Sequence, residues 1–375
     1  MEREAIEIVA VVSRAEQRAF WTLPYALYRG DKNWVAPLRP MERQRWSPRH
    51  NASLRTRRVR RFLARRDGRV VGRIASVVDP AFAARWAAEA GFFGFFECPD
   101  DAGVARALLG AAEADLRAQG VRHVLGPVNL TTNDEVGLQV DGFDSRPMVL
   151  SPYNPPYYPR LVEAAGYAAR LDYYAYGWTP DTGLAPVVAR LRGIAARDGV
   201  TVRPANPRRW DAETRLLFDL YNASFADLWG FVPLTWDEYQ GRTGEFRPFY
   251  RPELVLFAER DGRAVGFGLS LPDINELLAP LGGRLWPFGW LHLARGIRRI
   301  RSARFILLGV LPEHRARGVA VVIAAEMADA VRRLGIEQGE LSLVQADNKK
   351  IQAVIAACGG PRTKTYRLYE RRLAG

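Results

Sequence analysis

The chain has 375 residues, of which 48% are hydrophobic and 25% are charged, and its formal net charge is +13. These values are ordinary for a folded globular protein, so the composition excludes disordered, collagen-like and low-complexity chains. Two cysteines and four scattered histidines exclude a disulfide framework and give no zinc-ligand spacing, so we expect no metal site.

The N-terminal residues are charged, and no apolar run approaches the roughly 18 residues that span a bilayer. We therefore expect neither a signal peptide nor a transmembrane helix, and a cytoplasmic location. The positive charge favours an anionic partner. The arginine-rich run at 39–66 lacks the interleaved aromatics that stack on nucleic-acid bases, so we expect no nucleic-acid partner.

The first half of the chain predicts a hairpin, a long helix and further strands. Residues 64–72 place Asp-Gly between two alternating apolar runs, which is typical of a β-hairpin. From Leu108 to Leu116, apolar residues recur at helical spacing. A short helix then ends before Gly166, and a strand with two tyrosines follows, which completes an α/β pattern.

The second half repeats this pattern. Residues 258–266 match 64–72 at seven of nine positions, and Gly318-Val319-Ala320 matches Gly103-Val104-Ala105. Aligned blocks in the same order indicate a duplication. We therefore expect one domain at 1–178 and a second at 179–375, joined near 180–186. Each should have a mixed central sheet flanked by helices.

Residues 304–320 predict a phosphate site in the second domain. An apolar strand runs into a turn at Pro312, and a helix begins near Gly318. Backbone N–H groups at a helix start lack internal partners and carry partial positive charge, so they bind phosphate or pyrophosphate. Arg315 and Arg317 add two full charges there.

Arg315-Ala316-Arg317-Gly318-Val319-Ala320 resembles the Arg/Gln-x-x-Gly-x-Gly/Ala motif of the GNAT acyltransferases, and Asn348, followed by Gly359, resembles their next conserved block. The resemblance implies two tandem GNAT-like domains and a donor of acetyl-CoA or a longer acyl-CoA. It implies transfer to an amine of a small molecule or peptide. The implied CoA-binding residues are Leu308, Gly309, Val310, Arg315, Ala316, Arg317, Gly318, Val319, Ala320 and Asn348.

Two departures from the family limit what the resemblance implies. In the first domain, Asp100 stands where Arg315 stands in the second, and Asp101 follows it, so we expect no CoA there and read the acidic pair as helix caps. The tyrosine that often serves the family as acid is replaced by Ile355. The catalytic residues are therefore unknown, and a non-catalytic CoA-binding protein is the alternative.

Three polar residues are weak candidates for contact with the substrate amine. Asp273 and Glu276 are the possible catalytic groups, and Asn275 is a possible substrate contact; simple loop solvation is the alternative for all three. Cys358 is expected to be a small buried residue rather than a nucleophile.

The first domain contains a stretch rich in turn formers, amides and tyrosines. It could recognise the acceptor near the thioester, or it could be a structural loop that braces the domain interface. Its candidate residues are Asn129, Asn133, Glu135, Tyr153, Asn154, Tyr157 and Tyr158.

Residues 285–304 are aromatic and then basic. This segment could contact an anionic membrane peripherally, or it could cover a lipophilic acyl or acceptor chain. Alternatively, it could form a lid whose aromatics pack on their own domain.

Overall fold

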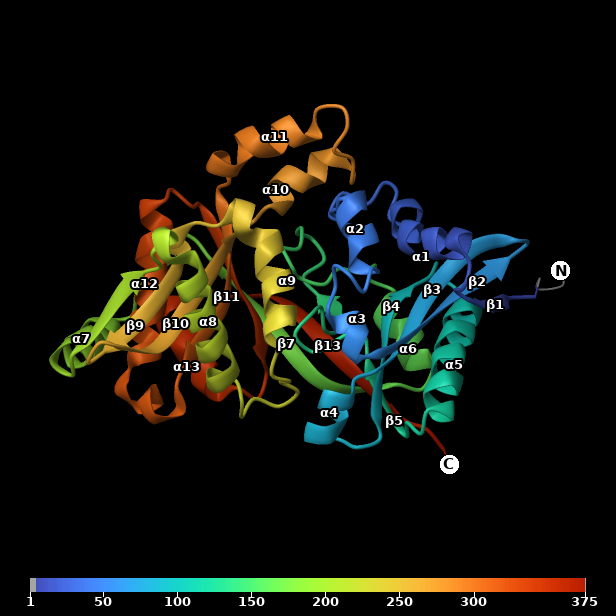
Figure 1. Ribbon diagram of the computed structural model, residues 1–375, viewed down its shortest axis with the longest axis horizontal. Coiled ribbons are helices and arrows are strands. Elements are labelled where there is room, and N and C mark those ends of the chain that lie inside the picture. Colours follow the sequence, from blue (N-terminus) through green and yellow to red (C-terminus); the bar gives the residue numbers. More distant parts are fainter. Residues whose placement is uncertain (1–4, 375) are drawn as a thin grey trace. The chain divides into compact units, whose positions relative to one another are not determined.

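The computed structural model describes residues 5–374, apart from the side chains of Glu245, Ala316 and Arg317. These residues form two compact units (Figure 1). The first holds the described chain up to Asp172, with Trp229–Val232 and the segment from Thr365 onward, and the second holds Tyr173–Leu228 and Pro233–Lys364. The division differs from the expected boundary at 178/179. The division falls inside a strand. The last strand of the chain belongs to the first unit because it pairs with a strand of that unit.

The first unit is built mainly from the N-terminal half of the chain. Its elements are β1 (Glu7–Ala10), α1 (Arg14–Leu27), α2 (Arg39–Arg45), α3 (Ser53–Thr56), β2 (Arg58–Arg66), β3 (Arg69–Val78), α4 (Pro80–Arg85), β4 (Ala90–Glu97), α5 (Ala102–Ala118), β5 (His123–Gly126), β6 (Leu138–Asp141), α6 (Tyr158–Ala164), the start of β7 (Ala168–Trp178) and most of β13 (Arg362–Arg372).

The second unit takes the rest of β7 and the elements that follow it. These are α7 (Pro186–Arg197), β8 (Val200–Pro204), α8 (Trp210–Ser224), α9 (Trp236–Phe246), β9 (Val255–Arg260), β10 (Arg263–Pro272), α10 (Asn275–Leu278), α11 (Gly289–Gly296), β11 (Ser302–Val310), α12 (Val319–Arg333), β12 (Gln338–Gln345) and α13 (Lys349–Cys358).

The two units have sheets of the same design. In the first, the strand order is β1-β2-β3-β4-β5-β13, with β6 also paired to β13; in the second it is β8-β9-β10-β11-β12-β7. In each sheet one neighbouring pair is parallel, β4 with β5 or β11 with β12. The other described neighbours along each order are antiparallel. The predicted fold, two repeated mixed sheets flanked by helices, is confirmed.

Both predicted hairpins form, and their turns are alike. Asp67 and Gly68 join β2 to β3 with φ values of 50° and 71°, and Asp261 and Gly262 join β9 to β10 with 51° and 73°. Two successive positive φ angles match the right-handed twist of the flanking strands, which is why Asp-Gly recurs at both turns.

A long helix packs on each sheet through the predicted apolar stripe. On α5 the buried residues include Leu108 and Leu116, and on α12 they include Ile323 and Met327. Helix α12 lies close to its sheet, because a Cβ added at Gly268 of β10 would lie 2.3 Å from the Met327 sulfur. Truncating such a buried Leu or Ile to Ala removes about 2–5 kcal/mol of stability. No described helix combines the length and apolar character that crossing a membrane requires.

Candidate functional site

The two parallel strands of the second unit pair over only part of their length. The described register of β11 and β12 ends at Phe305 opposite Leu341. Beyond this pair, β11 continues to Val310 along β10, and β12 continues to Gln345 along β7. The facing strand edges therefore diverge, and Leu308 on the β11 side is only half-buried. An extended ligand could hydrogen-bond to this edge of β11.

A short turn connects β11 to α12. Pro312–Arg317 form one stretch of 3-10 helix, and Gly318 follows with a φ of 72°. A side chain in this left-handed conformation would cost about 1–2 kcal/mol, so glycine suits the position. Gly318 is the N-cap of α12, and in the described chain no side chain caps this helix start. N–H groups at a helix start without a side-chain cap can bind an anion, and the helix dipole favours one.

Arg315 fixes this turn in place. Its guanidinium donates to the Ser224 carbonyl at 2.7 Å and to the Val310 carbonyl at 3.2 Å, and it lies 3.5 Å from the Asp227 carboxylate. The side chain thus ties the end of β11 to the end of α8 and holds positive charge beside the turn. The side chains predicted for Ala316 and Arg317 lie outside the described residues.

Asn348 and the following helix supply no catalytic hydroxyl at the expected position. The side-chain oxygen of Asn348 accepts from the Ile351 N–H at 3.2 Å and so caps α13. Ile355, which replaces the family tyrosine, is 3% exposed. Cys358 is buried, as expected, and burial raises the pKa of its thiol to about 11, which favours the neutral thiol near pH 7.

Sequence analysis missed a buried ionic cluster where β11 and β12 are still paired. Lys364 lies 3.0 Å from the Glu340 carboxylate, and these side chains are 5% and 3% exposed. The Ser342 hydroxyl donates to Glu340 at 2.7 Å and accepts from Arg304 at 2.9 Å. The available signal was polar residues two apart within an apolar strand, Glu340 and Ser342, which face the same side.

The weak catalytic candidates lie after β10 and make structural contacts. The Glu276 carboxylate accepts from the Arg301 N–H at 3.2 Å and from the Ser302 hydroxyl. Asp273 is 5% exposed and accepts from the Asn275 N–H at 3.3 Å. A role for these residues at the substrate amine stays a prediction.

In the first unit, the corresponding strands also diverge, but the chain itself occupies the open edge. The pairing of β4 with β5 ends at Phe92. Beyond it, the Val128 N–H donates to the Phe93 carbonyl at 2.8 Å, and the Asn129 side chain accepts from the Phe95 N–H at 2.7 Å. These bonds take the place that a ligand would need on β4.

The start of α5 is also satisfied internally. Asp101 accepts from the N–H groups of Gly103 and Val104 at 2.7 and 3.1 Å, which confirms it as a helix cap. A hydrogen bond from Arg66 lowers the pKa of Asp101, so its carboxyl group is ionised. Asp100 instead pairs with an arginine of α6. The uncapped helix start of the second unit, our candidate anion site, therefore has no counterpart at this helix.

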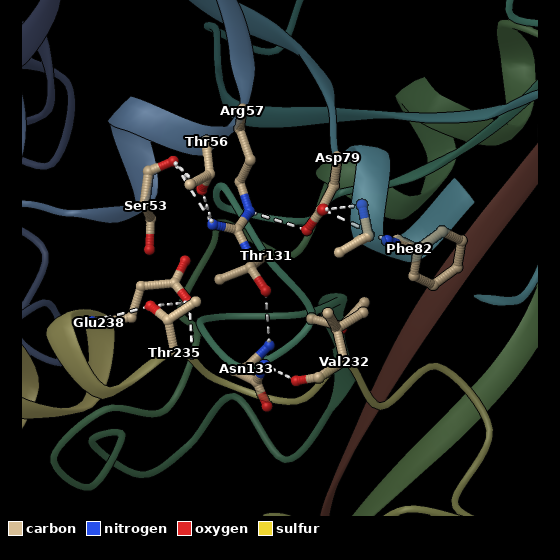
Figure 2. A network of polar contacts seen from close by, with 12 residues as sticks. Ser53, Thr56, Arg57, Asp79, Phe82, Thr131, Asn133, Val232, Thr235 and Glu238 are labelled. Atoms are coloured by element: carbon tan, nitrogen blue, oxygen red, sulfur yellow. Dashed lines mark hydrogen bonds and ion pairs between the residues drawn. The ribbon is translucent and has the colours of Figure 1, made fainter. Parts of the chain in front are cut away.

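The predicted recognition residues of the first unit hydrogen-bond within that unit. Asn129 donates to Glu135 at 2.6 Å, and Glu135 pairs with Arg45 at 3.2 Å. Burial raises the pKa of Glu135, but Arg45 and Asn129 outweigh it and hold the pKa below its usual value. Asn133 donates to the Val232 carbonyl at 2.7 Å (Figure 2).

The remaining four residues are engaged in the same way. Tyr153 donates to Asp31 at 2.7 Å, and Asn154 exchanges hydrogen bonds with the β6 backbone. Tyr157 donates to a backbone carbonyl, and Tyr158 donates to Glu97 at 2.8 Å. These contacts favour a bracing role for the loop, and acceptor recognition by it stays a prediction.

Two relatives match the chain over nearly their whole length. It is 36% identical to a protein of Caulobacter vibrioides (strain NA1000 / CB15N) named bacterial ceramide synthase, over 98% of each chain. It is 32% identical to the protein YghO of Escherichia coli (strain K12), over 96% of this chain and 94% of that protein. The chain belongs to the family of these two proteins. No protein-family model matches it.

A solved structure supports the fold of this chain. The tandem GNAT protein from the clavulanic acid biosynthesis pathway matches with a TM-score of 0.55 and 15% identity, covering 99% of each chain. The tandem GNAT resemblance of the sequence is thus confirmed as a fold. Together, the family and the fold support an acyltransferase activity.

We expect one coenzyme A site per chain in this family member. The second unit offers a free strand edge and an uncapped helix start, whereas both features are internally satisfied in the first unit. A calorimetric titration should therefore give a stoichiometry of one. Asp101→Ala should leave it unchanged, because Val128 and Asn129 still occupy β4. Two equivalent sites would contradict this asymmetry.

Proposed function

We propose that the second unit binds a long-chain acyl-CoA and transfers its acyl group to the amine of a sphingoid base, forming a ceramide-type amide. The observation that carries the proposal is the divergence of β11 and β12 beside the uncapped start of α12, in a chain 36% identical to a protein named for ceramide synthesis. Activity on acetyl-CoA or another amine would keep the reaction type but change the substrate class.

The reaction joins the amine nitrogen to the acyl carbon of the thioester. The C–N bond forms as the C–S bond breaks, and the sulfur leaves with the bonding electron pair. The ammonium loses two of its three protons to solvent or to a base, and the third stays on the amide nitrogen. A thiol has a pKa near 8.5, so a thiolate can leave without first receiving a proton. Ile355 therefore weakens general-acid catalysis at that position without excluding the reaction.

The donor-binding role falls to backbone groups around the turn. In this proposal Leu308–Val310 bond the pantetheine arm, and the N–H groups of Arg315–Ala320 hold the pyrophosphate. The positive φ of Gly318, the uncapped helix start and the positive charge that Arg315 holds beside the turn support such a ligand. Asn348 acts by capping the next helix at the end of β12.

Two groups of polar residues are candidates for binding the acceptor. The polar loop of the first unit is our candidate for contacts with the amine and hydroxyl groups of the acceptor. Asp273, Asn275 and Glu276 are the candidates within the second unit. All of these residues make structural hydrogen bonds, so substitution there requires a check of folding.

The test is amide formation from purified components. Incubation with a long-chain acyl-CoA and sphinganine should release free thiol and yield an N-acyl product by mass spectrometry. Acetyl-CoA and ethanolamine, used as the short donor and short acceptor, should react at least tenfold more slowly. An ester product or exclusive use of the short substrates would contradict the proposal. Coenzyme A binding without any amide would favour the non-catalytic alternative, which the buried Ile355 suggests.

A further inference from the structure

The segment between β10 and β11 presents three aromatic side chains to solvent. Trp286 is 81% exposed, Phe288 is 73% exposed and Trp290 is 55% exposed. The other large hydrophobic residues with high exposure in the described chain are isolated aliphatic ones, Val12, Leu150 and Val187. The lid interpretation, in which these aromatics pack on their own domain, is therefore wrong. Exposed aromatics gathered in one segment are typical of an interaction surface.

The backbone that carries these aromatics is held against its own unit. α11 lies beside α10 at one end of the unit, beyond the strands of the sheet (Figure 1). A Cβ at Gly296 would lie 2.5 Å from Leu277 of α10, so the two helices meet at close range. Arg251 also donates to the Ile297 carbonyl at 2.9 Å. The aromatics are thus displayed from an ordered base, which lowers the entropy lost on binding.

The same segment is basic and free of acidic residues. No Asp or Glu occurs between Glu276 and Glu313. Four arginines of the segment are exposed and have no ion-pair partner among the described residues, namely Arg284, Arg295, Arg298 and Arg299. Nearby Arg301 differs, since it pairs with Glu337 at 3.3 Å. A surface of this charge complements an anionic one.

We propose that residues 284–299 dock this protein on an anionic phospholipid bilayer. Trp286, Phe288 and Trp290 enter the headgroup region, where aromatic rings are favoured, and the four arginines contact lipid phosphates. This proposal rests on the exposed aromatics and the unpaired arginines that one ordered segment carries together. Membrane docking therefore does not depend on the identity of the acyl acceptor. A bilayer offers a partner for both kinds of side chain, because an apolar layer for the aromatic rings lies below a layer of phosphates for the arginines.

Vesicle co-sedimentation of the full chain tests the proposal. The wild type should bind phosphatidylcholine vesicles that contain phosphatidylglycerol, and bind pure phosphatidylcholine at least tenfold more weakly. Replacing Trp286, Phe288 and Trp290 together by Ser should lower binding about 100-fold. Arg298→Gln with Arg299→Gln should lower it about 25-fold, because each arginine near an anionic surface contributes roughly fivefold.

Matched substitutions on α7 of the same unit serve as controls. Val187→Ser, and Arg190→Gln with Arg197→Gln, change one exposed aliphatic residue and two exposed arginines elsewhere. They should alter vesicle binding less than twofold, and every variant should keep the coenzyme A affinity of the wild type. The proposal is overturned if the wild type ignores anionic vesicles or if the aromatic variant binds them normally. It is also overturned if that variant only converts a dimer to a monomer, since the patch would then join two copies of the chain.

Discussion

Arg315→Glu should weaken coenzyme A binding by about 100-fold or more, equivalent to about 2.7 kcal/mol. Two unit charges about 7 Å apart interact by about 2 kcal/mol at an effective dielectric of about 20, and the substitution turns such an attraction into a repulsion. The glutamate would also face the Ser224 and Val310 carbonyl oxygens that now accept from Arg315. The turn that presents the N–H groups would lose its anchor together with its charge.

Arg333→Glu is the matched control for this experiment. Arg333 is an exposed residue in the last turn of the same helix, α12, so the charge change is identical and lies at the opposite end. Calorimetry should show less than a threefold effect on coenzyme A affinity. Equal affinity losses in the two variants would indicate a long-range charge effect, and unchanged affinity in Arg315→Glu would place the pyrophosphate elsewhere. Arg315→Gln, which keeps a donor but removes the charge, should fall between wild type and Arg315→Glu.

The repeated parts of the fold were predictable because short-range chemistry specifies them. Asp67-Gly68 and Asp261-Gly262 can take two successive positive φ angles, so the hairpins follow from local sequence. The spacing of Leu108 and Leu116 is a helix property and needs no knowledge of the partner sheet. The turn before α12 was predictable for the same reason, since Gly318 marks the left-handed residue.

The exchange of the last strands could not be predicted from the sequence. Strand β13 completes the sheet of the first unit, and β7 completes that of the second. Both strands have similar tyrosine-bearing patterns, so either fits either sheet by local criteria. Long-range pairs decide which sheet each strand joins. Tyr369 opposite Gly126 is one such pair, and these residues are too far apart in the sequence for a local pattern to reveal their contact.

The roles of individual polar side chains were also hidden from sequence reasoning. The residue types of Asn129 and Glu135 suit ligand recognition and internal bracing equally well, and only their mutual distance of 2.6 Å shows that they contact each other. Arg315 was expected to add charge to a phosphate site, and the structure shows in addition that it anchors the turn. The burial of Glu340 could not be predicted either, because it depends on both faces of the sheet being covered.

Glu340→Gln should destabilise the second unit by about 3 kcal/mol, because it leaves the buried Lys364 without its counter-charge. The substitution keeps the size of the side chain and an oxygen that can accept from Ser342, so the lost charge is the main change. At about 2 kcal/mol per molar of urea, the unfolding midpoint should fall by about 1.5 M. Arg304, which donates to Ser342 at 2.9 Å, brings a second positive charge into the same cluster.

Glu337→Gln, three residues earlier, isolates the effect of burial. Glu337 pairs with Arg301 at 3.3 Å, but these side chains are 65% and 63% exposed, so the same substitution should remove less than about 1 kcal/mol. If the urea midpoints of the two variants fall equally, the buried pair contributes no more than a surface one. The expected difference matters for function because Glu340 lies opposite Arg304, one residue before the last β11–β12 pair. Loss of the cluster should therefore loosen the closed end of the diverging strands, and coenzyme A affinity should fall in Glu340→Gln while it stays unchanged in Glu337→Gln.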